Sequence, residues 1–195
     1  SSNIGMLKAA SRMTQDEFRG YVEAFGLARR TEVDLPYERT GITSALSARS
    51  GYAMYFAPWG QGVSVTPIQM LSAVNTIANG GVPTRPHVSL DLEVAPMARL
   101  ISADAAKTTV DIMVSVVDDG SGRSAQMEGI RVAGKTGTSQ KVEEGRPGYK
   151  PGAYISSFVG FFPADAPRYS MLIVIDEPQG AYYGSQGTPP GLLDG

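Results

Sequence analysis

The spacing of apolar residues changes near residue 130, and this change constrains the fold more than any other feature. Before it, apolar residues recur at helical intervals, as in residues 103–118. After it, residues 130–138, 153–162 and 168–176 have the composition of strands. The last two segments are apolar on both faces, which indicates a sheet covered on both sides. We therefore expect an α/β (α+β) fold, with an antiparallel sheet flanked by helices on both faces.

Two helices are predicted at the start of the chain, over residues 3–11 and 14–25. The second begins with Thr14-Gln15-Asp16-Glu17, which has the spacing of a capping box, and Gly26 is a natural stop. Residues 27–62 show no sustained period. We interpret them as a loop packed on its own aromatic side chains, with a groove lined by those side chains as the alternative.

A third helix begins at Thr66-Pro67-Ile68-Gln69, where Thr66 is the expected N-cap and proline takes the first helical position. Gly80-Gly81 ends it. Gly120-Ser121-Gly122 is predicted to form the turn from the last helix into the sheet, and residues 163–167 a hairpin connection between two strands.

Lys135-Thr136-Gly137-Thr138 carries the candidate chemistry. Lys135 would supply a positive charge for a substrate carboxylate, and the hydroxyls of Thr136 and Thr138 could donate to it. Gly137 has no Cβ and leaves room for a ligand backbone. The N–H of Thr138 is a candidate oxyanion donor. On an edge strand, this stretch would bind a peptide by strand addition. Taken alone, the tripeptide is equally compatible with a surface lysine beside a turn.

Ser1-Ser2-Asn3 adds an S-x-N pattern at the other end of the chain. S-x-N and K-T-G motifs accompany an S-x-x-K nucleophile in penicillin-binding proteins and class A β-lactamases. Ser1 would then relay a proton, and Asn3 would hydrogen-bond to substrate or lysine. No S-x-x-K is present in this sequence, so we expect the nucleophile to lie before residue 1. The residues three positions before each lysine are Gly5, Asp104, Val132, Thr138 and Pro147.

The sequence around these motifs resembles the transpeptidase domain of class B penicillin-binding proteins, in particular the septal, cell-division type. The resemblance covers almost the whole chain and is weakest over residues 31–60. The matching stretches are residues 66–70, 77–81, 131–138, 157–164, 175–178 and 182–184.

This resemblance implies a peptidoglycan D,D-transpeptidase that cross-links stem peptides through a serine acyl-enzyme and is acylated by β-lactams. It also implies cell-division proteins as partners and a membrane-anchored parent acting at the extracytoplasmic face. Residues 1–195 would be a partial domain, inactive alone, because the segment bearing the nucleophile is absent. Residues 185–191 do not continue the family pattern, so we expect the C-terminal helix to be missing. The resemblance also implies that the family's first strand, which pairs with its last, is absent, so the strand near 168–176 would have an unpaired edge.

Two alternatives remain open at this stage. One is a penicillin-recognising hydrolase, either a D,D-carboxypeptidase or a β-lactamase. Such an enzyme needs a base for the deacylating water, and no glutamate placed for this role is evident. The other is a non-catalytic penicillin-binding sensor or scaffold domain. An S-x-x-K upstream of Ser1 would favour an acyl-enzyme, and its absence a binding role.

Composition excludes several other classes of site. The 195 residues carry a net charge of −2 without a basic run, which gives no support for a nucleic-acid partner. The chain has no cysteine, so neither a disulfide nor a thiolate metal site can form. His87 is the only histidine and is predicted to be a plain loop residue, which excludes a Ser-His-Asp triad within the chain. Asp118-Asp119 and Asp176-Glu177 lie at predicted element ends, and we assign no metal and no cofactor.

Overall fold

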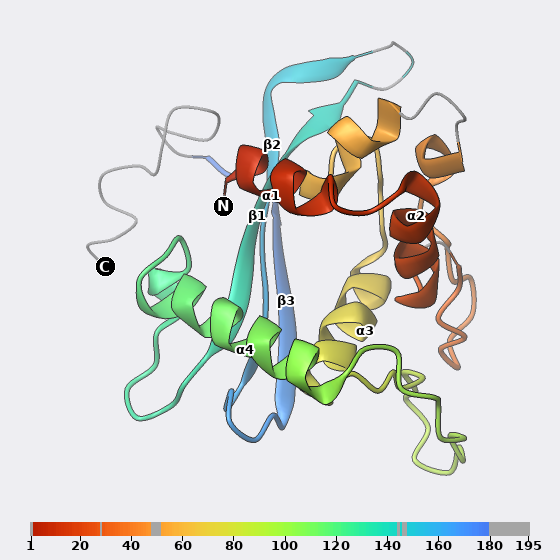
Figure 1. The fold of residues 1–195 in the computed structure, drawn as a ribbon, viewed down its shortest axis with the longest axis vertical. Coiled ribbons are helices and arrows are strands. Elements are labelled where there is room, and N and C mark those ends of the chain that lie inside the picture. The colour runs from red at the N-terminus through yellow and green to blue at the C-terminus, as the bar shows by residue number, and fades with distance from the viewer. Residues whose placement is uncertain (1, 28, 48–51, 144, 146–147, 180–195) are drawn as a thin grey trace. The chain divides into compact units, whose positions relative to one another are not determined.

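The computed structural model describes residues 2–179, except residues 28, 48–51, 144 and 146–147 (Figure 1). The chain divides into two compact units, residues 1–107 and residues 108–195, and the boundary falls within helix α4 (Ala103–Asp118). The predicted range of that helix is confirmed. Each unit is described by itself below.

The first unit is mainly helical. Helices α1 (Asn3–Ala10), α2 (Gln15–Ala24) and α3 (Pro67–Ala78) confirm the three predicted helices. Both predicted N-caps form a capping box, in which the N-cap side chain accepts from the N3 amide and the N3 side chain accepts from the N-cap amide. These local hydrogen bonds explain why the helix starts could be located from the sequence.

The described residues between α2 and α3 include three short 3₁₀ helices, Ser44–Ser47, Tyr52–Tyr55 and Ala57–Trp59. The rings of Phe56 and Trp59 meet edge to face with centroids 5.7 Å apart. The contact agrees with the prediction that aromatic side chains of this loop pack on one another.

Gln69 anchors this long segment to the start of α3. Its side chain is completely buried, and its Nε2 donates to the carbonyls of Arg29 at 2.7 Å and Thr40 at 2.9 Å. Its Oε1 accepts from the amide of Thr66 at 2.8 Å. Because a buried amide must find partners for its donors and acceptor, the loop carbonyls and the α3 N-terminus hold each other in place.

We predict that Gln69→Leu lowers the free energy of unfolding by about 3 kcal/mol, since it removes three hydrogen bonds of a buried side chain and leaves the carbonyls of Arg29 and Thr40 and the amide of Thr66 without this partner. Chemical denaturation monitored by circular dichroism measures the change. Gln61→Leu is the matched control, because Gln61 is exposed and should shift stability by no more than about 0.5 kcal/mol. Equal stability of the two variants would contradict the role given to Gln69.

The second unit is built on an antiparallel sheet of strands β1 (Ala133–Val142), β2 (Tyr149–Phe162) and β3 (Tyr169–Asp176), in the order β1-β2-β3 (Figure 1). The antiparallel sheet is confirmed. β1 begins and ends later than the predicted segment 130–138. Its outer half, residues 138–142, is mostly polar and lacks the alternating apolar residues that predict a strand. Pairing with β2 makes this part a strand.

The outer strand β3 differs from the expectation of a sheet covered on both faces. Val159 and Phe161 of β2 are buried, whereas Ile173 and Ile175 of β3 are 49% and 52% exposed. β3 has one strand neighbour among the described residues, so its apolar side chains are covered less than those of the central strand.

Candidate active site

The stretch Lys135-Thr136-Gly137-Thr138 lies in the first half of β1, opposite residues 156–159 of β2. β1 is an edge strand in the described part of the sheet, which is the position that strand addition needs. The side of β1 that faces away from β2 therefore offers backbone N–H and C=O groups to which an extended peptide can pair.

Side chains alternate across a strand, so Lys135 and Gly137 lie on one face of β1 and the two threonines on the other. The motif predicts that the lysine and the threonine hydroxyls bind one carboxylate, but it does not show which face of the strand each side chain takes. The structure shows that the charge and the hydroxyls approach the edge of the strand from opposite sides.

Lys135 is half-buried, and its Nζ donates to the carbonyl of Thr136 at 2.7 Å. Burial lowers the pKa of the Lys135 ammonium from its ordinary value, because desolvation disfavours the charged form. A partly desolvated cation interacts more strongly with an anion than one in bulk water. This lysine is therefore suited to binding a carboxylate.

Gly137 also avoids a close cross-strand contact, which the sequence does not reveal. A Cβ at this position would lie 2.6 Å from the Oγ of Ser157 on β2. The space beside Gly137 is thus partly filled by its own cross-strand neighbour, in addition to any room it leaves for a ligand.

Ser121 is a further residue of this region that motif reasoning missed. Its Oγ lies 2.7 Å from Oγ1 of Thr136. The turn that carries it is confirmed as the predicted exit from α4, and it packs closely on the helix end. A Cβ at Gly120 or Gly122 would lie 2.8 Å or 3.1 Å from the carbonyl of Val116. The flanking glycines indicate a turn at Ser121. They do not indicate its contact with Thr136, because the two residues are 15 positions apart in the sequence.

The ring of Phe158 fixes the backbone just before the lysine. Phe158 lies opposite Thr136 and covers glycines of both strands. A Cβ at Gly134 would lie 2.2 Å from its Cζ, and a Cβ at Gly160 would lie 3.0 Å from its Cε1. Gly122 meets the same ring, because its Cβ would lie 3.4 Å from Cε2. The ring therefore packs against β1, β2 and the turn after α4 together.

We predict that Gly134→Ala destabilises the second unit by about 1–3 kcal/mol, because the added methyl group forces the Phe158 ring out of its place. Thermal unfolding measures the loss, and Phe158→Leu in the same chain should restore part of it. Gly20→Ala is the control: no atom lies within 4 Å of its added Cβ, and alanine in a helix should stabilise slightly. Full stability of Gly134→Ala would show that the ring is not held there.

Asn3 is the first residue of α1, and the Ser2 side chain caps this helix by accepting from the amide of Gly5 at 3.1 Å. Ser1 lies outside the described residues. Asn3 belongs to the first unit and Lys135 to the second. Of the site residues predicted from the sequence, the structure therefore brings four together within one unit. They are the consecutive residues Lys135, Thr136, Gly137 and Thr138 of β1.

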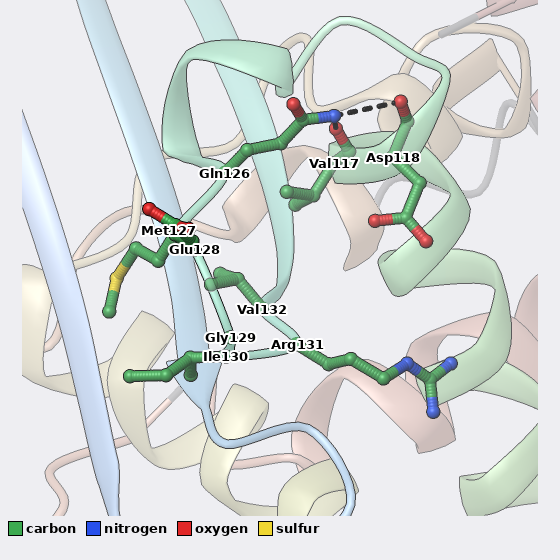
Figure 2. A pocket seen from close by; sticks show the side chains of 9 residues that line it. All are labelled: Val117, Asp118, Gln126, Met127, Glu128, Gly129, Ile130, Arg131 and Val132. Atoms are coloured by element: carbon green, nitrogen blue, oxygen red, sulfur yellow. Dashed lines mark hydrogen bonds between the residues drawn. The ribbon is translucent and has the colours of Figure 1, made fainter.

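A pocket of 520 Å³ lies between the end of α4 and the segment that leads into β1, and Figure 2 shows its lining. The Nε2 of Gln126 donates to the carbonyls of Val117 and Asp118, at 3.1 Å and 2.9 Å, and so caps the helix. The pocket includes no residue of the K-T-G-T stretch, so it is separate from the candidate site. It is lined by Val117, Asp118 and residues 126–132.

Of the two acidic pairs considered from the sequence, Asp176-Glu177 has another role, in ion pairs. Among the described residues, no group of three or more His, Cys, Asp or Glu side chains could hold a metal ion. Asp176 and Glu177 pair with lysines. His87 is exposed, and one ring nitrogen lies 3.4 Å from the carbonyl of Arg85. None of the helices in the described ranges has the length and apolar character needed to cross a membrane.

Residues 1–190 match the family profile of the penicillin binding protein transpeptidase domain. The chain belongs to this family. The resemblance inferred from the motifs is thereby confirmed. The K-T-G-T stretch is therefore an edge-strand segment of a penicillin-binding transpeptidase domain.

Individual relatives agree with this assignment. The chain is 36% identical over 92% of its length to stage V sporulation protein D of Bacillus subtilis, and 32% identical over 97% to the peptidoglycan D,D-transpeptidase FtsI of Escherichia coli. It spans 29% and 32% of these two proteins.

Solved structures show the same fold. The crystal structure of penicillin binding protein 3 from Mycobacterium tuberculosis, complexed with aztreonam, has a TM-score of 0.81 at 33% identity over 91% of this chain and 43% of that one. The transpeptidase domain of penicillin-binding protein 3 from Burkholderia pseudomallei has a TM-score of 0.82 at 30% identity, over 91% and 54%. The mixed fold of helices and antiparallel sheet predicted for the penicillin-binding transpeptidase domain is thereby confirmed.

Proposed function

We propose that this chain is part of a peptidoglycan D,D-transpeptidase that cross-links stem peptides through a serine acyl-enzyme and that β-lactams acylate. The observation that carries the proposal is the half-buried Lys135 on an edge strand, in a chain of the penicillin-binding transpeptidase family. Relatives named as D,D-transpeptidases support it, as does a related structure complexed with a β-lactam. The hydrolase and non-catalytic alternatives have no comparable support.

The roles of the residues follow from the edge-strand geometry. A peptide added to β1 lies in the plane of the sheet, between the two faces. The Lys135 ammonium acts on its carboxylate from one face, and the hydroxyls of Thr136 and Thr138 donate from the other. The amide of Thr138 supplies one oxyanion donor, since a preorganised N–H stabilises the charge that develops on the attacked carbonyl.

Ser121 sets the direction of one of these hydrogen bonds. A hydroxyl has a single O–H, so Thr136 can donate to a carboxylate only if Ser121 donates to Thr136. The 2.7 Å separation of the two oxygens suits this arrangement. The resulting chain of hydroxyls polarises the Thr136 donor toward the substrate.

The remaining roles come from the S-x-N pattern. We assign Ser1 the relay of the leaving-group proton and Asn3 a hydrogen bond to substrate or lysine. The nucleophile belongs to an S-x-x-K element, which this sequence does not contain. The reaction is placed at the extracytoplasmic face of the membrane, with cell-division proteins as partners of the protein that contains this chain.

We predict that the 195-residue chain by itself forms no covalent adduct with a fluorescent penicillin, because no serine in it is paired with a lysine three positions later. Gel fluorescence and intact-mass spectrometry are the measurements. A stable serine-linked adduct on this chain would contradict the assignment of Ser1 as an accessory residue.

We predict that Lys135→Ala slows acylation by about 10²–10³-fold in a protein that joins this chain to an S-x-x-K segment, because one electrostatic contact to the transition state is lost. Stopped-flow labelling with a fluorescent penicillin measures the rate. Lys107→Ala is the control, because this exposed lysine lies on a helix outside the K-T-G-T strand. Wild-type kinetics in Lys135→Ala would refute the proposed function.

A further inference from the structure

The ladder between β1 and β2 is interrupted just beyond the K-T-G-T stretch. Gln140 pairs with Tyr154, but the next pair is Val142 with Tyr149. Lys141 of β1 therefore stands opposite four residues of β2, Lys150 to Ala153. An interruption of this kind disrupts the backbone hydrogen bonds locally and redirects side chains. Beyond Gln140, the β1–β2 hairpin therefore needs interactions other than regular ladder hydrogen bonds to hold its two strands in place.

A cluster of four charged residues lies at this interruption, and we call it the ionic clamp: Lys141, Lys150, Asp176 and Glu177. The Nζ of Lys141 lies 2.8 Å from one carboxylate oxygen of Asp176 and 3.0 Å from the other. It also lies 3.0 Å from Oε1 of Glu177, and Lys150 reaches that same oxygen at 2.8 Å. Both arms of the hairpin therefore converge on one carboxylate at the end of β3.

The backbone holds Glu177 where the two lysines meet. The last pair between β2 and β3 joins Ile155 to Asp176, and the amide of Glu177 donates to the carbonyl of Tyr154 at 2.9 Å. Glu177 has a φ of 47°, a left-handed conformation that is uncommon for a glutamate. This conformation turns the chain just after β3, with the carboxylate facing both lysines.

The electrostatics agree with this geometry. Hydrogen bonds from Lys150 and Lys141 lower the pKa of Glu177 to about 2, and hydrogen bonds to Asp176 and Glu177 raise the pKa of Lys141. Because the pKa of Glu177 lies below its ordinary value of 4.5, the clamp contributes stability above that pH and is lost as the pH falls toward 2. Lys141 is the least exposed of the four side chains, at 26%.

We propose that Lys141 is a positioning residue for the reaction: through the ionic clamp it holds the outer part of β1 across the ladder interruption, and so aligns the edge that runs back to Thr138. This inference rests on the proposed function. Thr138 is three residues before Lys141, and the strand between them has β2 as its single described strand neighbour. A small displacement of the oxyanion donor or of the substrate-pairing edge is enough to slow an acyl transfer.

The test compares Lys141→Met with two other variants in a protein that joins this chain to an S-x-x-K segment. Lys141→Arg keeps the charge. Arg131→Met removes a second exposed ion pair, between Arg131 and Asp165, at the opposite end of the same sheet. The readouts are the second-order rate of acylation by a fluorescent penicillin and the hydrogen exchange of the amides of residues 138–142. Glu177→Gln repeats the test from the other partner.

We expect Lys141→Met to lower the acylation rate by about tenfold, since a displacement of the oxyanion donor and of the substrate-pairing edge by a fraction of an ångström slows the transfer by about this factor. The amides of residues 138–142 should exchange faster by a similar factor. Lys141→Arg and Arg131→Met should stay within about twofold of wild type. Wild-type acylation in Lys141→Met, or an equal loss in Arg131→Met, would overturn the positioning role.

A second arm separates this inference from the proposed function. If the wild-type joined protein is not acylated, the proposed function fails. Hydrogen exchange on the 195-residue chain itself then decides on the clamp. Faster exchange at residues 138–142 in both Lys141→Met and Glu177→Gln supports it, and unchanged exchange in both overturns it.

Discussion

The packing of one ring, Phe158, is the constraint on which the candidate site depends. An aromatic side chain over glycines brings the strand backbones close to it, and here it covers Gly134 and Gly160 at once. The same ring meets Gly122 in the turn after α4. The turn that carries Ser121 and the strand that carries Thr136 are thus set against a common surface, and two hydroxyls that are distant in sequence can meet.

The separation of charge and hydroxyls across β1 gives the edge two distinct sides. Lys135 is drawn partly out of water on one face, where burial lowers its pKa. The threonines are on the other face, and Thr136 is oriented by Ser121. An anionic ligand in the plane of the sheet would meet both, whereas a ligand bound on one face alone would meet only one of them. This geometry is what the proposed recognition of an extended peptide that ends in a carboxylate requires.

Local features of the fold could be predicted from the sequence, and long-range ones could not. The starts of α2 and α3 followed from Thr14 and Thr66, because a capping box is complete within four residues. The helix α4 followed from its regular apolar spacing. The end of β1 did not, since its polar outer half is a strand only through its pairing with β2. The family and the K-T-G-T stretch were recognised from motifs, but a motif does not show which face of a strand each side chain takes.

The contact between Gly137 and Ser157 restricts how this site can vary. A Cβ at position 137 would lie 2.6 Å from the Ser157 hydroxyl in its present rotamer, so the effects of substitutions at the two positions are coupled. A larger residue at 137 is accommodated when the Ser157 hydroxyl takes another rotamer or when position 157 becomes smaller. The cost of a substitution at 137 is therefore set by the residue across the ladder, and a lineage with a smaller side chain at 157 accepts it more readily.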